Sequence, residues 1–160
     1  MTKDVKMIMT IEIENSRGMA TEYMIPSDHF GQKMRKIQKQ IGELISKGAI
    51  ESYENRIRKE EAKGLKVLGR ETRVVEMECG KVAVKRRVYQ RKDGRRWKPI
   101  DELLGLEKYQ RRDEKVMERN CVLAAQTTYR RTAEISSYLN EKAISASTIG
   151  RDVKRVGGKI

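Results

Sequence analysis

The sequence has few of the residues on which disulfide-linked or zinc-binding proteins depend. Its 160 residues include two cysteines, one histidine and two prolines, and aromatic residues make up 5% of the chain. A tetrahedral zinc site needs four ligands, so Cys79, Cys121 and His29 are too few to form one. The two cysteines lie far apart in the sequence, and we expect them to be free thiols in a reducing cytoplasm.

The chain also lacks long apolar stretches. No segment approaches about 18 consecutive apolar residues, the length of a transmembrane helix. The N-terminus shows no unbroken apolar run of about 7–15 residues, which a secretory signal requires. These absences predict a cytoplasmic protein.

Positive charge is what the sequence has in excess. Its 36 lysines and arginines exceed its 23 aspartates and glutamates, which gives a formal net charge of +13. The surplus is concentrated, because residues 64–100 carry +8 whereas residues 1–63 carry +2 and residues 101–160 carry +3. Such a field favours a polyanionic partner, namely DNA, RNA or an acidic membrane surface.

Apolar periodicity predicts an α+β fold that is mostly helical and built from three parts. In residues 1–63, strict alternation over residues 5–13 predicts a strand. Apolar residues then recur three and four positions apart over residues 30–45, and a second helical pattern covers residues 49–62. These two stretches predict a helical hairpin, with Gly64 ending its second helix.

Residues 64–100 predict a basic, three-stranded antiparallel meander. The expected strands cover residues 73–78, 81–89 and 95–98, and the last turn contains an Asp-Gly pair typical of two-residue hairpin loops. Alternation along the second strand places valines on one face and cations on the other. Arg86 falls on the valine face, where it needs a partner or must extend its guanidinium to solvent.

The cations of this segment predict contacts with phosphates rather than with bases. Neutralised phosphates release counterions, so binding should weaken steeply with salt. Trp97 and Tyr89 either stack on exposed bases or belong to the core. The candidate DNA-backbone residues are Lys81, Lys85, Arg87, Arg91, Arg95 and Arg96.

Residues 101–160 predict a helix-turn-helix-like unit of three helices. Asp113 is the expected N-cap of the first helix and Ser145 that of the last, whose apolar residues form a narrow stripe. Small and basic side chains cover its other faces, a composition suited to entering a major groove and pairing with bases and phosphates. The candidate DNA-binding residues of this helix are Ser147, Thr148, Arg151, Lys154 and Arg155.

The residues do not predict a catalytic site. His29 lies at the start of an expected helix without the setting of a Ser-His-Asp triad, and the sequence contains no glycine-rich phosphate loop. The six aspartates fall at caps, a turn and helix starts, so we expect no metal site in this chain.

Five stretches between Lys63 and Ile149 together resemble a known family. Leu-Gly-Leu-Glu-Lys-Tyr at residues 104–109 and Thr-Tyr-Arg-Arg-Thr-Ala at residues 128–133 are the most specific of them. In their order the stretches resemble the N-terminal half of the ISLre-type insertion-sequence transposases. They cover residues 63–71, 80–89, 99–109, 124–134 and 144–149.

The resemblance implies a function in DNA transposition. Such proteins resemble other DDE recombinases, in which an N-terminal part holds the terminal inverted repeats of the mobile element. A ribonuclease-H-like domain follows and uses three acidic residues with Mg²⁺ to cut and rejoin DNA. No position of this chain matches that acidic triad, and the sequence ends at Ile160. We therefore expect a truncated remnant or an excised part that lacks the catalytic domain, so that Mg²⁺ is expected only for the missing domain.

The leading interpretation is a DNA-binding module that binds double-stranded DNA at terminal inverted repeats, associates with the nucleoid and has no membrane partner. A homodimer on paired repeats fits such binding. One alternative is a subunit of a Mg²⁺-dependent DDE transposase that is active only with a downstream catalytic chain. Another is an RNA-binding or structural adaptor whose charges solvate its surface.

Overall fold

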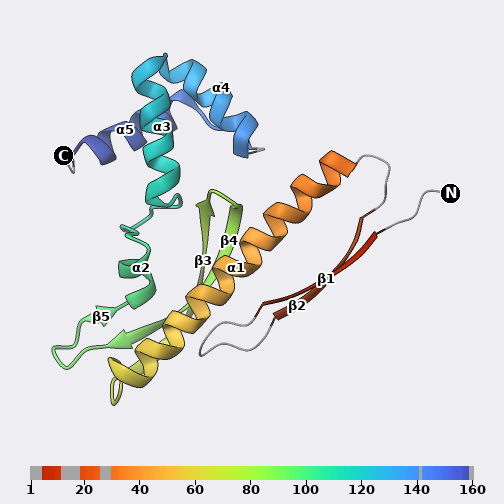
Figure 1. Cartoon of the computed structure of the whole chain (residues 1–160). Helices are drawn as coiled ribbons and strands as arrows, with labels where there is room; N and C mark the ends of the chain where they lie inside the picture. Colours follow the sequence, from red (N-terminus) through yellow and green to blue (C-terminus); the bar gives the residue numbers. More distant parts are fainter. Residues whose placement is uncertain (1–4, 12–18, 26–29, 141, 159–160) are drawn as a thin grey trace.

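The computed structural model describes residues 5–11, 19–25, 30–140 and 142–158, and it has the predicted α+β fold (Figure 1). The described residues form a two-stranded sheet, a three-stranded sheet and five helices. The strands are β1 (Val5–Ile11), β2 (Met19–Ile25), β3 (Lys66–Met77), β4 (Gly80–Gln90) and β5 (Arg96–Trp97). The helices are α1 (Phe30–Glu60), α2 (Pro99–Leu103), α3 (Glu114–Gln126), α4 (Tyr129–Asn140) and α5 (Ala146–Gly157).

The N-terminal strand is present and pairs with a second strand that the sequence analysis did not predict. β1 runs antiparallel to β2, with Val5 opposite Ile25 and Ile11 opposite Met19. β2 ends on two successive apolar residues, Met24 and Ile25, so its pattern departs from the strict alternation that indicates a strand. Residues 12 and 13 of the predicted strand lie outside the described residues.

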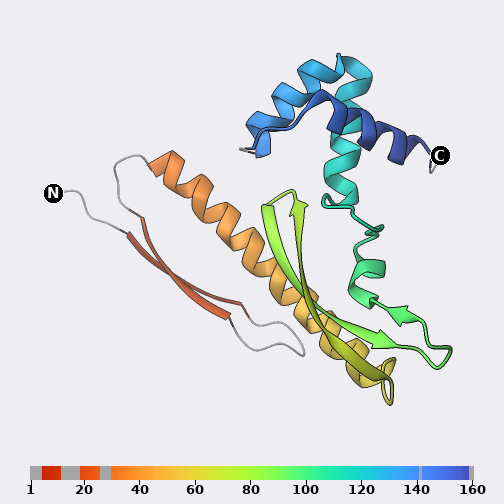
Figure 2. The same ribbon diagram turned by 180° about the vertical axis from the view of Figure 1, so that it is seen from behind.

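The predicted helical hairpin over residues 30–62 is wrong. A single helix, α1, spans these residues and lies along the three-stranded sheet (Figure 2). Of its internal glycines, Gly42 permits close packing and does not end the helix. A Cβ atom added at Gly42 would lie 2.6 Å from the Cβ atom of Cys79, and Gly48 is buried. Gly42 therefore lies against the turn between β3 and β4 without ending the helix.

The antiparallel meander is confirmed, with strand order β3-β4-β5. β3 begins at Lys66, whereas the predicted strand began at residue 73. The first part of β3 was not predicted because it is exposed on both faces and has no apolar alternation. A register shift between Val67 and Gly69 further interrupts the pattern. The predicted apolar face of β4 is correct, since Val82, Val84 and Val88 are all buried.

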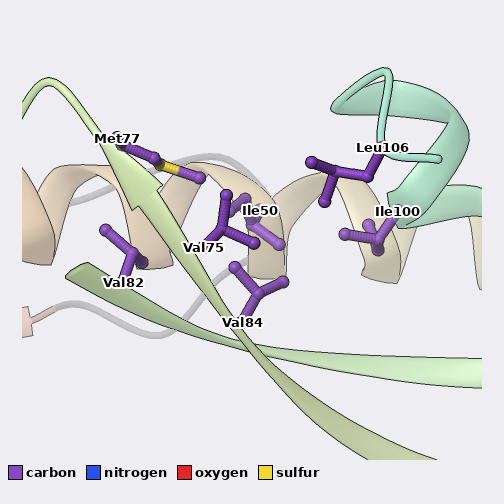
Figure 3. Close-up of a cluster of buried hydrophobic side chains, with 7 residues drawn as sticks. All are labelled: Ile50, Val75, Met77, Val82, Val84, Ile100 and Leu106. Carbon is purple, nitrogen blue, oxygen red and sulfur yellow. The ribbon is translucent and has the colours of Figure 1, made fainter. Parts of the chain in front are cut away.

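Two apolar clusters join the sheet to the helices. In the first, Ile50 of α1 meets Val75 and Val84 of the sheet and Ile100 of α2 (Figure 3). The second contains Ile57, Ala62, Tyr89 and Trp97. Tyr89 is 1% exposed and Trp97 is 8% exposed, so both belong to the core. The alternative in which their rings stack on bases is therefore wrong.

Arg86 finds its partners in an ion-pair network between the sheet and α2. Its guanidinium binds Asp101 and also Glu71, at 2.9 Å between Nη2 and Oε2. Arg73 Nη1 lies 3.1 Å from Asp101 Oδ2, so one carboxylate holds two arginines. Lys98 donates a hydrogen bond to Glu71, which lowers the pKa of that carboxyl below its usual value. Three cations thus share two carboxylates.

Removing Asp101 should destabilise the fold, because the buried Arg86 and the half-buried Arg73 would lose their shared counterion. We expect Asp101→Ala to lower the free energy of unfolding by about 3 kcal/mol in urea denaturation. Glu134→Ala, which removes an exposed partner of Arg131, should change it by less than about 0.5 kcal/mol. Equal effects of the two substitutions would contradict the structural importance of the network.

Candidate nucleic-acid interface

The C-terminal helix α5 is capped and exposed as predicted for a recognition helix. Ser145 is its N-cap, and the Ser145 side chain accepts a hydrogen bond from the backbone N–H of Thr148 at 3.3 Å. Ile149 is completely buried, whereas Val153 and Val156 are half-buried. In Figure 2, α5 lies in front of α3 and no other described element covers it. One face of α5 packs on α3 and α4, and the other faces outward.

A buried carboxylate holds α5 in this position. Asp152 is 1% exposed and receives hydrogen bonds from Arg112, with Nε–Oδ2 and Nη2–Oδ1 distances of 3.0 Å and 2.5 Å. Asn120 of α3 donates to Asp152 at 2.9 Å, and Ser136 of α4 donates to Asn120 at 2.6 Å. Polar side chains of α3, α4 and α5 therefore meet in one hydrogen-bonded group.

The buried role of Asp152 was not predicted from the sequence, although one signal was present. Asp152 lies three residues after Ile149, on the same face of the predicted helix as the apolar stripe. A carboxylate on a buried stripe needs a cation or donors. Its partner Arg112, 40 residues earlier, cannot be identified from spacing.

Residues 111–113, which include Arg112, join the three-helix unit to the sheet. Glu76 of β3 donates its backbone N–H to Arg111 and accepts from the N–H of Asp113, at 2.7 Å and 3.0 Å. Asp113 caps α3 as predicted, accepting from the N–H of Val116, and its burial raises its pKa above the usual value. α3 is therefore fixed relative to β3 by backbone hydrogen bonds at its start.

The predicted DNA-binding residues of α5 differ in their exposure and in whether they form ion pairs. Ser147, Arg151 and Lys154 are exposed, and Thr148 is half-buried. Arg151 donates a hydrogen bond from Nη2 to the Thr148 hydroxyl at 3.3 Å. Arg155 is half-buried and forms a 3.1 Å ion pair with Glu107, so its charge is already partnered. Arg151 and Lys154 are thus the cations of this face that form no ion pair with another described residue, and we call them the free cations of α5.

The predicted sheet residues do not form one group. Lys81 and Lys85 are exposed and form no ion pair with another described residue. Arg87 binds Glu54 of α1 at 3.1 Å, so its charge is partnered within the fold. The other three lie in or next to the β4–β5 turn, at the end of the sheet away from α5 (Figure 1). These are Arg91, Arg95 and Arg96.

Cations that the sequence analysis did not select surround a pocket of about 930 Å³ beside the sheet. They come from four separate parts of the chain: β3, the residue before α2, the segment between α2 and α3, and the connection between α4 and α5. This separation explains why no local spacing reveals them. With Lys81 and Arg86, the basic residues lining this pocket are Arg73, Lys98, Lys108, Arg111 and Lys142.

Among the described residues there is no candidate metal cluster, membrane-spanning helix or disulfide. No group of three or more His, Cys, Asp or Glu side chains in the described part of the chain could hold a metal ion. No described helix is long and apolar enough to cross a membrane. Cys79 and Cys121 are free thiols, as predicted, and burial raises the pKa of Cys121.

Comparison with known proteins adds no identity: no family profile, no curated protein and no solved structure matches the chain. The resemblance to ISLre-type transposases therefore stays a prediction.

The coupling between Asp152 and Arg112 can be measured with a double-mutant cycle. Asp152→Ala should lower the free energy of unfolding by about 3 kcal/mol, because it leaves the Arg112 guanidinium and the Asn120 amide without an acceptor. Arg112→Ala should then cost much less in the Asp152→Ala background, giving a coupling energy of about 2 kcal/mol. Additive effects would show that the two side chains do not stabilise the fold together.

Proposed function

We propose that this protein binds double-stranded DNA by inserting α5 into the major groove. The observation that carries the proposal is the two-sided character of α5. Ile149 and Asp152 fix one face, and the opposite face presents Ser147, Arg151 and Lys154 to solvent. A helix held in this way can enter a groove about 12 Å wide without losing its contacts with α3 and α4.

The side chains of this face have complementary chemistry for DNA. Ser147 is short and lies in the first turn, so the helix start can approach base edges closely. Arg151 can donate two hydrogen bonds to a guanine edge, and Lys154, nearly one turn later, can neutralise a phosphate. Lys81 and Lys85 of the sheet supply further unpaired cations for the DNA backbone.

We further propose that the DNA is a terminal inverted repeat and that the chain is the DNA-binding part of an insertion-sequence transposase acting on nucleoid DNA in the cytoplasm. This step rests on the resemblance of residues 63–149 and not on the geometry of α5. The Mg²⁺-dependent strand transfer of that family is assigned to no residue of this chain.

Loss of the free cations of α5 should weaken DNA binding in a manner that depends on salt. We expect wild-type affinity for a selected duplex to fall by about two orders of magnitude or more between 50 and 200 mM salt. Arg151→Ala should weaken specific binding at least about tenfold. Lys154→Ala should make the slope of log affinity against log salt concentration shallower by about one, the amount expected for the loss of one phosphate contact. Fluorescence anisotropy titrations over a salt series measure both effects.

Arg58→Ala is the matched control, because Arg58 is an exposed cation in the last turn of α1, which is not part of the proposed interface. It should leave affinity within about twofold of wild type. A salt-independent affinity, or equal losses for Arg58→Ala and Arg151→Ala, would remove α5 as the DNA-binding element.

A further inference from the structure

The cationic pocket beside the sheet lies outside the proposed recognition face. It is lined by residues of β3 and β4, by Lys98 and Asp101 at the start of α2, by the segment between α2 and α3, and by Lys142 between α4 and α5. Seven basic side chains but only two carboxylates, Glu76 and Asp101, contribute to its lining. A pocket of about 930 Å³ falls within the usual size range of small-molecule sites.

The carboxylates of the pocket are already occupied. Asp101 is shared by Arg73 and Arg86, and the buried Nε of Arg86 has no hydrogen-bond partner. Glu76 lies 3.6 Å from the ammonium of Lys142. Lys98 is paired with Glu71 at 2.8 Å. The uncompensated positive charge of the lining is therefore that of Lys81, Lys108 and Arg111, and it favours an anionic ligand.

Three cations at this pocket are available to such a ligand. Lys81, Lys108 and Arg111 are exposed, and none of them forms an ion pair with another described residue. They come from β4 and from the segment before α3, so they approach the pocket from different elements. Their lysine and arginine side chains are those that bind phosphate groups.

An exposed tyrosine in an unusual backbone conformation lies among these cations. Tyr109 lines the pocket, its side chain is 84% exposed, and the ammonium of Lys108 lies 5.1 Å from its ring centroid. Its φ of 65° makes it the one non-glycine residue with positive φ in the described part of the chain. Tyrosine rarely adopts this conformation, and strained residues of this kind cluster at functional sites.

We propose that this pocket binds an unpaired nucleotide of a DNA strand, with its base stacked on Tyr109 and its phosphate held by Lys81, Lys108 and Arg111. An exposed aromatic ring can stack only on a base whose face is uncovered, as at a single-stranded end or a flipped-out position. Inside a duplex, neighbouring base pairs cover both faces. The inference rests on the proposed function only in taking DNA as the ligand.

The direct test is binding of a fluorescein-labelled dT10 oligonucleotide, measured by anisotropy. Tyr109→Phe retains the ring and should bind within about twofold of wild type. Tyr109→Gly removes the ring but suits the positive φ, so the protein should stay folded by circular dichroism while affinity falls roughly 5- to 100-fold. Tyr138→Ala removes another exposed tyrosine that does not line the pocket and should bind like wild type.

Two further ligands separate stacking from simple charge attraction and from RNA binding. A decamer of abasic deoxyribose phosphates should bind wild type more weakly than dT10, and Tyr109→Gly should abolish this difference. A U10 oligonucleotide should bind no more tightly than dT10. Equal wild-type affinity for dT10 and the abasic decamer, unchanged dT10 binding by Tyr109→Gly, or tighter binding of U10 would overturn the inference.

The α5 variants distinguish failure of this inference from failure of the proposed function. Arg151→Ala should weaken binding to a blunt duplex without affecting dT10, whereas Tyr109→Gly should affect dT10 and leave the blunt duplex unchanged. If only the first effect is seen, α5 binds duplex DNA and the pocket assignment is wrong. If only the second is seen, the pocket assignment holds and the proposed role of α5 is wrong.

Discussion

The ion pair between Asp152 and Arg112 is the contact on which the position of α5 depends. An unpartnered carboxylate at a site with 1% exposure would be strongly unfavourable, so α5 is held where Arg112 and Asn120 can reach Asp152. Arg112 in turn follows Arg111, whose carbonyl accepts a hydrogen bond from β3. One buried charge thus links the outermost helix to the sheet.

The cations of this protein form two groups, those paired with carboxylates inside the fold and those exposed to solvent. The net charge alone does not distinguish the two groups. Several arginines are partnered within the fold: Arg73 and Arg86 by Asp101, Arg87 by Glu54, and Arg112 by Asp152. Planar guanidinium groups suit such half-buried pairs, since they can donate several hydrogen bonds in fixed directions. Other exposed cations form no ion pair with another described residue, and we propose that they contact DNA; among them are Arg151 and Lys154 of α5, Lys81 and Lys85 of β4, and Lys108 and Arg111 beside the pocket.

Local pattern predicted much of the fold because its causes are local. Alternation correctly placed Val82 and Val84 in the core, and Ser145 was identified as a cap because a cap acts within one helical turn. The hairpin was wrong because the apolar pattern divides into two stretches, over residues 30–45 and 49–62, whereas the structure has one helix that packs along the sheet. The exposed face of α5 is predicted from one helix, but the pocket is assembled from segments whose proximity no spacing reveals.

The most direct test of the account is a dimethyl sulfate footprint on a duplex selected from a randomised library. This reagent methylates guanine N7 in the major groove and adenine N3 in the minor groove. With α5 in the major groove, wild-type protein should protect guanine N7 within the site, and protection should be lost in Arg151→Ala. Unprotected guanine N7 together with protected adenine N3 would contradict the account, because it would place the protein in the minor groove.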